Sequence, residues 1–119
     1  MIGIPCGVRF FVITTPTDMR KGYDSLAAIV RDIGHNPMNG HIFVFFSKRR
    51  NRYKFLYWQR DGFVIQMKRL ARGTFKVPPV KEGQKQVQID AAQLAFLLEG
   101  IDFTRLKHAK RWRPRKIKL

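Results

Sequence analysis

The sequence predicts an α+β fold: an antiparallel sheet of three to five strands packed with two helices, followed by a flexible basic tail. Three observations predict it. The chain has 119 residues, 45% of them hydrophobic and 13% aromatic, which suits one domain with a real core. Segments rich in β-branched and aromatic residues alternate with two segments of helical period. A dipeptide typical of hairpin turns separates two of the strand-like segments. We expect the domain to span residues 1–103 and the tail residues 104–119.

The first strand and the first helix are expected in the N-terminal third. Residues 8–14 (VRFFVIT) have strand composition, and Pro16 ends the strand. Thr17 or Asp18 is placed to cap the helix that follows, and Gly34 to end it. The helix is predicted by residues that follow a 3.6-residue period, namely Met19, Tyr23, Leu26, Ala27, Val30 and Ile33.

Three further strands are expected in the centre of the chain. Residues 41–46 (HIFVFF) and 53–58 (YKFLYW) are strand-like and are joined by the basic loop SKRRNR. Asp61-Gly62 is a strong hairpin signal and leads into FVIQMKRL. If these two residues form the turn, Arg60 faces Phe63, Trp58 faces Ile65 and Leu56 faces Met67. The side with Leu56, Trp58, Ile65 and Met67 is the more apolar, so we expect it to pack against the first helix.

The last third is predicted to hold a long loop and a second helix. Residues 71–88 mix Gly, Pro and charge, which indicates a loop around a short strand at residues 75–77. Asp90 and Gln93 have capping-box spacing, and Gly100 is placed to end a helix of about ten residues. Leu94, Leu97 and Leu98 repeat with helical spacing inside it.

The charge of the chain indicates a polyanionic partner. The chain has 24 Lys and Arg against 8 Asp and Glu, a formal net charge of +16. Nucleic acid is the usual partner of a small domain this basic, whereas the alternative is a merely solvated surface. Within the domain, the candidate phosphate contacts are Lys48, Arg49, Arg50, Arg52, Lys54, Lys68, Arg69 and Arg72. In the tail, the candidates are Arg111, Trp112, Arg113, Arg115 and Lys116. Arg20 and Lys21 lie near a predicted helix N-terminus, where a phosphate would fit between them, although both could simply face water.

Aromatic residues give a weaker indication of nucleic-acid binding. Phe55 and Tyr57 alternate with Lys54 and could stack exposed bases on an open sheet face. The alternative is that both are core residues beneath a helix.

Catalytic and metal sites are not indicated. The acidic residues show no pairing at metal-ligand spacing, and the three His residues are scattered along the chain. Cys6 has no nearby His at a recognisable spacing, so a thiol nucleophile is not expected. We expect no cofactor and no enzymatic activity. One Cys, no leader pattern and no apolar run of membrane-spanning length predict a cytoplasmic protein without a membrane partner.

Four segments of the chain resemble one family. They are TDMRKGYDSLAAIV, GHIFVFFSKRRNRYKFLYWQRDGF, KRLARGTFKVP and QLAFLLEGID, in this order, and the resemblance spans about residues 2–103. Together they resemble the small accessory protein, usually called TnpB, of the sixty-six family of bacterial insertion sequences. This sequence departs from the family pattern at Asn51, Gln59 and Ala71 and in its unusually basic tail. These departures leave less negative charge than the pattern has.

The resemblance implies a non-catalytic accessory protein of DNA transposition, encoded beside a separate transposase. It assigns no mechanism. The charge and the resemblance together predict a DNA-binding helper that acts on insertion-element ends or on duplex DNA in general. The alternative is a module that bridges to the transposase without direct DNA contact, using Trp58, Trp112 or the LLEGID segment as an apolar anchor. Oligomeric state is open.

Overall fold

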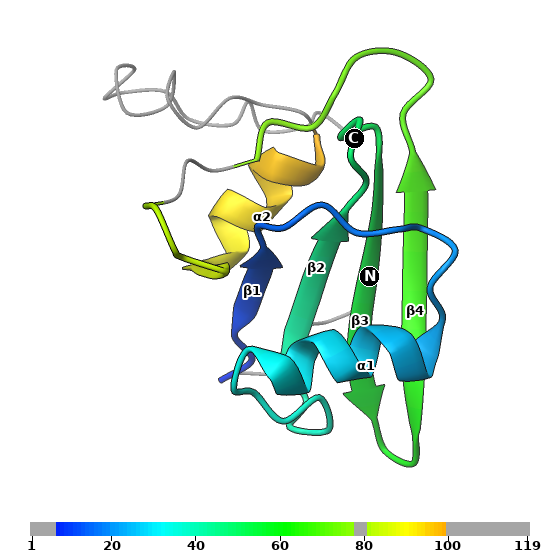
Figure 1. The fold of residues 1–119 in the computed structure, drawn as a ribbon, viewed down its shortest axis with the longest axis vertical. Coiled ribbons are helices and arrows are strands. Elements are labelled where there is room, and N and C mark those ends of the chain that lie inside the picture. Colours follow the sequence, from blue (N-terminus) through cyan, green and yellow to red (C-terminus); the bar gives the residue numbers. More distant parts are fainter. Residues whose placement is uncertain (1–6, 78–80, 100–119) are drawn as a thin grey trace, which may run out of the picture.

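The computed structural model describes residues 7–77 and 81–99, and it contains one five-stranded sheet and two helices (Figure 1). The strand order is β4-β3-β2-β1-β5. The strands are β1 (Phe10–Ile13), β2 (Ile42–Phe46), β3 (Arg52–Gln59), β4 (Gly62–Arg69) and β5 (Gln86–Ile89). The helices are α1 (Tyr23–Asp32) and α2 (Ala91–Leu98). The predicted α+β class is confirmed. The tail at 104–119 and the domain boundary before it lie outside the described residues.

The sheet is antiparallel except for one pair of strands. β1 and β2 run parallel, whereas β1–β5, β2–β3 and β3–β4 are antiparallel. α1 lies between β1 and β2 in the sequence and supplies the crossover that a parallel pair requires.

The two helices cover opposite faces of the sheet. Successive residues of a strand point to opposite sides, so the continuous apolar runs of β1 and β2 supply two separate cores. The core beneath α1 consists of Phe11, Ile13, Leu26, Ala27, Val30, Phe43, Phe45 and Leu56. The core beneath α2 consists of Phe10, Val12, Ile42, Val44, Phe46, Phe55, Phe75, Ile89, Leu94 and Leu97. The chain therefore forms three layers, helix on sheet on helix.

The first helix begins later than the sequence predicts. α1 starts at Tyr23, its N-cap position is Gly22, and no side chain caps it. The prediction that Thr17 or Asp18 caps the helix is therefore wrong, because both residues precede the helix and Asp18 begins a separate turn. The predicted end is correct: Gly34 takes φ +91 and its N–H donates to the carbonyl of Arg31 at 3.0 Å.

The β3–β4 hairpin has a register two residues away from the predicted one. Trp58 pairs with Phe63, Leu56 with Ile65, and Gln59 with Gly62, so the turn residues are Arg60 and Asp61. Arg60 takes the positive φ of 57 that the sequence pattern assigns to glycine. A shift of two leaves every side chain on its predicted face. Leu56, Phe63 and Ile65 accordingly pack on the α1 side, as predicted, whereas Met67, which was expected there too, is 58% exposed and belongs to neither core.

The segment between β4 and α2 differs from prediction in two places. No strand forms at residues 75–77, where Phe75 instead buries its side chain in the α2-side core and donates its N–H to the carbonyl of Arg50. β5 lies at Gln86–Ile89 and overlaps the end of the predicted loop at residues 71–88. The predicted capping box is confirmed: Asp90 Oδ1 accepts from the Gln93 N–H at 2.7 Å, and Gln93 Oε1 accepts from the Asp90 N–H at 3.0 Å. α2 has eight residues.

Candidate nucleic-acid interface

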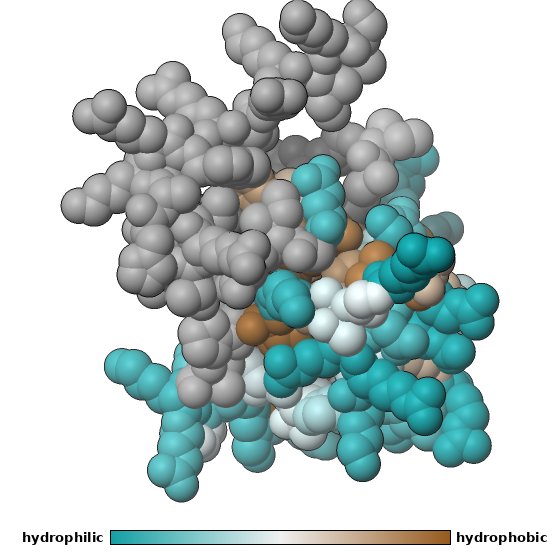
Figure 2. Space-filling model, turned by 90° about the horizontal axis from the view of Figure 1, so that it is seen from above, coloured by the Kyte–Doolittle hydropathy of each residue, from teal (hydrophilic) through white to brown (hydrophobic). Residues whose placement is uncertain are grey.

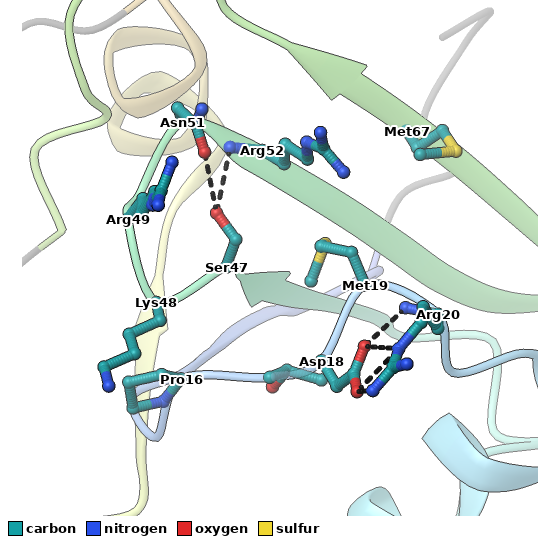
Figure 3. Close-up of a pocket in the computed structure, with 11 residues that line it drawn as sticks. Pro16, Asp18, Met19, Arg20, Ser47, Lys48, Arg49, Asn51, Arg52 and Met67 are labelled. Atoms are coloured by element: carbon teal, nitrogen blue, oxygen red, sulfur yellow. Dashed lines mark hydrogen bonds and ion pairs between the residues drawn. The ribbon is translucent and has the colours of Figure 1, made fainter.

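An open groove of about 590 Å³ lies between two loops at one end of the sheet (Figure 3). One wall is the segment after β1, and the other is the turn between β2 and β3. The lining residues are Pro16, Thr17, Asp18, Met19, Arg20, Ser47, Lys48, Arg49, Asn51, Arg52 and Met67. Four of these side chains are cationic and one is acidic, so the groove is electropositive. Viewed from above, the described part of the surface is largely hydrophilic around a smaller apolar area (Figure 2).

The β2–β3 turn is fixed by its own hydrogen bonds. The Arg50 N–H donates to the Ser47 carbonyl at 2.9 Å, and the Ser47 N–H donates to the Arg52 carbonyl at 3.1 Å. The Ser47 hydroxyl donates to Asn51 Oδ1 and accepts from the Arg52 N–H, both at 3.2 Å. Arg50 takes φ 56. This turn presents Lys48 and Arg49 as exposed side chains on a backbone that is already ordered.

The opposite wall is held by an ion pair. Arg20 donates to the Asp18 carboxylate from its side chain and its backbone. Nη2 donates to Oδ2 at 2.8 Å, and Nε lies 3.1 Å from both carboxylate oxygens. The backbone N–H of Arg20 donates to Oδ1 at 2.8 Å. These hydrogen bonds lower the pKa of Asp18 to about 2 and raise the pKa of Arg20. Asp18 is therefore ionised at neutral pH. The carboxylate bonding to the N–H two residues on is an Asx-type turn, which the spacing of Asp18 and Arg20 could have indicated.

The structure brings some of the predicted cations together and separates others. Four of the predicted cations line the groove, namely Arg20, Lys48, Arg49 and Arg52. Met19 and Met67 also line it, although the sequence did not predict either as a site residue. Arg69 lies directly opposite Arg52 in the β3–β4 ladder. Arg50 and Arg72 are exposed beside this end of the sheet but do not line the groove. Lys68 alternates with Arg69 along β4 and so points to the other face.

Lys54 does not present its charge to a ligand. Its side chain is 8% exposed, and its ammonium donates to the Lys21 carbonyl at 2.8 Å. Lys54 thus ties the segment before α1 to β3, and we remove it from the predicted phosphate contacts. Lys21 itself is exposed but lies outside the groove lining. The prediction that Arg20 and Lys21 lie at a helix N-terminus is wrong, because α1 begins only at Tyr23.

Base stacking on Phe55 is excluded by burial. Phe55 is 2% exposed beneath α2, and its ring stacks on Tyr53 with centroids 4.6 Å apart. Tyr57 is half-buried, and its hydroxyl accepts from Gln66 Nε2 at 3.3 Å. The sequence did not decide whether this face of the sheet is exposed. In the structure α2 covers it.

The described residues offer neither a metal-binding cluster nor a membrane-spanning helix. Within residues 7–77 and 81–99, no group of three or more His, Cys, Asp or Glu could hold a metal ion. No helix in that part of the chain is long and apolar enough to span a bilayer. The tail candidates Arg111, Trp112, Arg113, Arg115 and Lys116 lie outside the described residues, as does Cys6.

The chain matches one family model and close relatives over almost its whole length. The family model described as IS66 Orf2 like protein matches residues 8–108. The uncharacterized protein y4jC of Sinorhizobium fredii is 37% identical over 118 residues, covering 98% of this chain and 99% of the relative. The uncharacterized protein y4hO of the same strain is 37% identical over 117 residues, covering 96% and 98%. No solved structure matches. The predicted kinship is thereby confirmed: the chain belongs to the IS66 Orf2-like family of accessory proteins of insertion-sequence transposition.

Proposed function

We propose that this accessory protein binds duplex DNA in the cytoplasm through the groove and assists a separate transposase without performing catalysis itself. The observation that carries the proposal is the convergence of Arg20, Lys48, Arg49 and Arg52 on one groove with a single carboxylate, Asp18. Lys48 and Arg49 come from the β2–β3 turn and Arg20 from the segment after β1, so this concentration of charge is a product of the fold.

Phosphodiesters are the ligands that suit Lys48, Arg49 and Arg52. Arg binds phosphate oxygens bidentately, and Lys binds them as a point charge. Each phosphate that a cation neutralises on duplex DNA releases condensed counterions, which makes the affinity fall with salt. Arg69, opposite Arg52, adds a like charge to the same face. Directly opposed like charges destabilise a ladder, so an anion bound near both would relieve repulsion.

A salt titration tests the proposal. We expect the Lys48→Ala, Arg49→Ala double variant to bind random-sequence and element-end duplexes more weakly by similar factors. Its log–log salt slope should flatten by up to about 1.8, because each lost phosphate contact removes about 0.9. The matched control is Lys81→Ala, Lys85→Ala, which removes the same charge from exposed positions before β5. Equal losses in both variants would show that only net charge matters. No duplex binding by the unaltered chain at low salt would overturn the proposal.

We also propose the transposase of the same element as the protein partner, because the described surface exposes large apolar side chains. Met67 is 58% exposed and Tyr23 is 51% exposed. Trp58 is half-buried, with its indole N–H donating to the Arg60 carbonyl at 3.1 Å. A pull-down with purified transposase and added nuclease tests this. A complex that survives supports direct contact, whereas its loss indicates that the two proteins meet only through DNA.

A further inference from the structure

We propose that Arg20, held by Asp18, contacts a guanine edge in the major groove and gives the protein its base preference. The inference rests on the proposed DNA binding. It divides the groove cations into two kinds: Arg20, which reads a base, and the cations of the opposite wall, which grip phosphates.

Arg20 is the most tightly positioned cation of the groove, yet its side chain is 91% exposed. Its contacts with Asp18 use the backbone N–H, Nε and Nη2. A guanidinium carries five N–H donors, so both donors of Nη1 and one of Nη2 remain outside these contacts. Guanine O6 and N7 accept such a pair of donors side by side. Because the guanidinium is already oriented, binding a base edge costs less side-chain entropy than it does for a free Arg.

The neighbouring carboxylate favours a base edge over a phosphate as the ligand of Arg20. Asp18 accepts from Arg20 Nη2 at 2.8 Å, so the pair has almost no net charge. A phosphate at Arg20 would be repelled by the ionised Asp18, whereas the guanine edge is uncharged. The salt bridge of Asp18 with Arg20 is the one salt bridge found among the described residues. Lys48, Arg49 and Arg52 thus keep their full charge for phosphates.

Two methionine side chains line the groove together with the cations. Met19 projects from the Asp18–Arg20 segment into the space before the β2–β3 turn, and Met67 lies beyond Arg52 (Figure 3). Met67 is 58% exposed. Apolar side chains suit base edges and the thymine methyl group, and they offer nothing to a phosphate. The groove therefore changes from phosphate-binding to base-binding chemistry across its width.

Binding to a randomised duplex library, followed by sequencing of the bound fraction, tests the inference. We expect the unaltered chain to enrich guanine at one position, with about 5- to 140-fold discrimination against other bases, the range for one bidentate contact. Arg20→Lys keeps the charge but loses the planar pair of donors and the Nε contact with Asp18 that orients it, so the enrichment should weaken while the salt slope is unchanged. Arg31→Lys is the matched control, because Arg31 is exposed on α1 away from the groove lining, and it should keep the enrichment.

Asp18→Asn provides a second, independent variant. Asn can still accept the Arg20 N–H but no longer neutralises the guanidinium. We expect tighter binding to random duplex, a salt slope steeper by up to about 0.9, and weaker guanine enrichment. Thermal unfolding of each variant checks that the fold is retained.

The outcomes separate this inference from the function on which it rests. Duplex binding without base enrichment would overturn the role of Arg20 and leave phosphate binding intact. Enrichment as strong in Arg20→Ala as in the unaltered chain would also overturn it, as would an Arg20→Ala variant whose affinity falls equally for all sequences with a slope flatter by about 0.9. Absence of duplex binding by the unaltered chain would refute both proposals.

Discussion

At the scale of single residues, neighbouring cations have different roles. Lys48 and Arg49 are exposed on an ordered turn, Arg20 is paired with Asp18, and Lys54 is buried against a backbone carbonyl. Burial and partners decide which of these charges is available to a ligand. The residue type alone does not, because Lys can cover apolar surface with its stem while its ammonium bonds a carbonyl.

We expect Lys54→Met to destabilise the protein and to leave DNA binding unchanged. The variant keeps the apolar stem but removes the ammonium that donates to the Lys21 carbonyl. A hydrogen bond from a charged group contributes about 1.5–3 kcal/mol, so urea unfolding should show a loss of that size. Lys68→Met is the control, because Lys68 is exposed on β4, and it should stay within about 0.5 kcal/mol. Unchanged stability with weakened DNA binding would restore Lys54 to the interface.

The stability of the protein should fall as the pH is lowered below about 6.5, through His41. Its Nδ1 accepts the Arg9 N–H at 3.0 Å, which requires an unprotonated nitrogen. Burial, followed by the charges of Arg9 and His35, lowers the pKa of His41 from 6.5 in the folded state. The unfolded chain therefore takes up the proton first, and stability present above pH 6.5 is lost as pH falls through the lowered pKa. The melting temperature of the His41→Gln variant should change less between pH 7.5 and pH 5 than that of the unaltered protein. An identical pH profile in both proteins would contradict this role.

At the scale of elements, the two hairpin loops of the sheet differ in what fixes them. The β2–β3 turn is held by the Ser47 and Asn51 side chains. Both turns place an arginine at positive φ, Arg50 in the β2–β3 turn and Arg60 in the β3–β4 turn. Only in the β3–β4 turn does a glycine, Gly62, lie two residues further on, where it pairs with Gln59 within the ladder. The positive φ of Arg60 therefore costs backbone strain that a glycine at this position would avoid.

Arg60→Gly should therefore stabilise the hairpin. The left-handed conformation costs an L-residue roughly 1–2 kcal/mol, and part of that returns when glycine takes the position, offset by glycine's greater chain entropy. Gly62→Ala should cost little, because Gly62 has no positive φ and a Cβ there meets nothing within 4 Å. Urea unfolding of the two variants measures both effects. The reverse order, with Gly62→Ala strongly destabilising and Arg60→Gly neutral or worse, would indicate that Asp61 and Gly62 form the turn.

At the scale of the whole molecule, the sheet acts as a rigid support for loops at one end. Both of its faces are covered by helices, so ligand binding is left to the loops and to strand ends. The segment after β1 and the turn after β2 meet at the groove because β1 and β2 are parallel neighbours whose carboxyl ends lie at the same edge. The crossover through α1 makes β1 and β2 parallel, and this brings the two walls of the groove together.

The basic tail is predicted to add nonspecific affinity to the groove. We expect replacement of Arg111, Arg113, Arg115 and Lys116 by Gln to weaken binding equally across sequences. The salt slope should flatten by up to about 3.6, because each lost phosphate contact removes about 0.9. Any guanine preference should persist, since it is assigned to Arg20. A changed base preference, measured with the same randomised library, would place sequence reading in the tail instead.

Much of the fold could be predicted from local sequence. The strands at residues 42–46 and 52–59, the helical period of Leu26 and Val30, and the Asp90–Gln93 capping box each depend on nearby residues, and each is confirmed. β5 was missed because it is only four residues long and follows a segment rich in Gly, Pro and charge, so its alternation of Gln with Val and Ile is a weak signal without the pairing with β1. The hairpin register was missed because tertiary packing overrode the usual preference for glycine at positive φ.

The sequence by itself determined the α+β class, the family and the strongly cationic character, because composition, periodicity and motif order need no contacts between distant residues. The tertiary structure decided which cations share a surface, which one is buried and which carboxylate accompanies them. Lys48 and Arg20 are 28 positions apart in the chain and line one groove, whereas Lys54 lies close to Lys48 in sequence and is hidden. The physical reason is that strand alternation and parallel pairing, which are set by the packing of both helices on the sheet, assign each side chain its face and its neighbours.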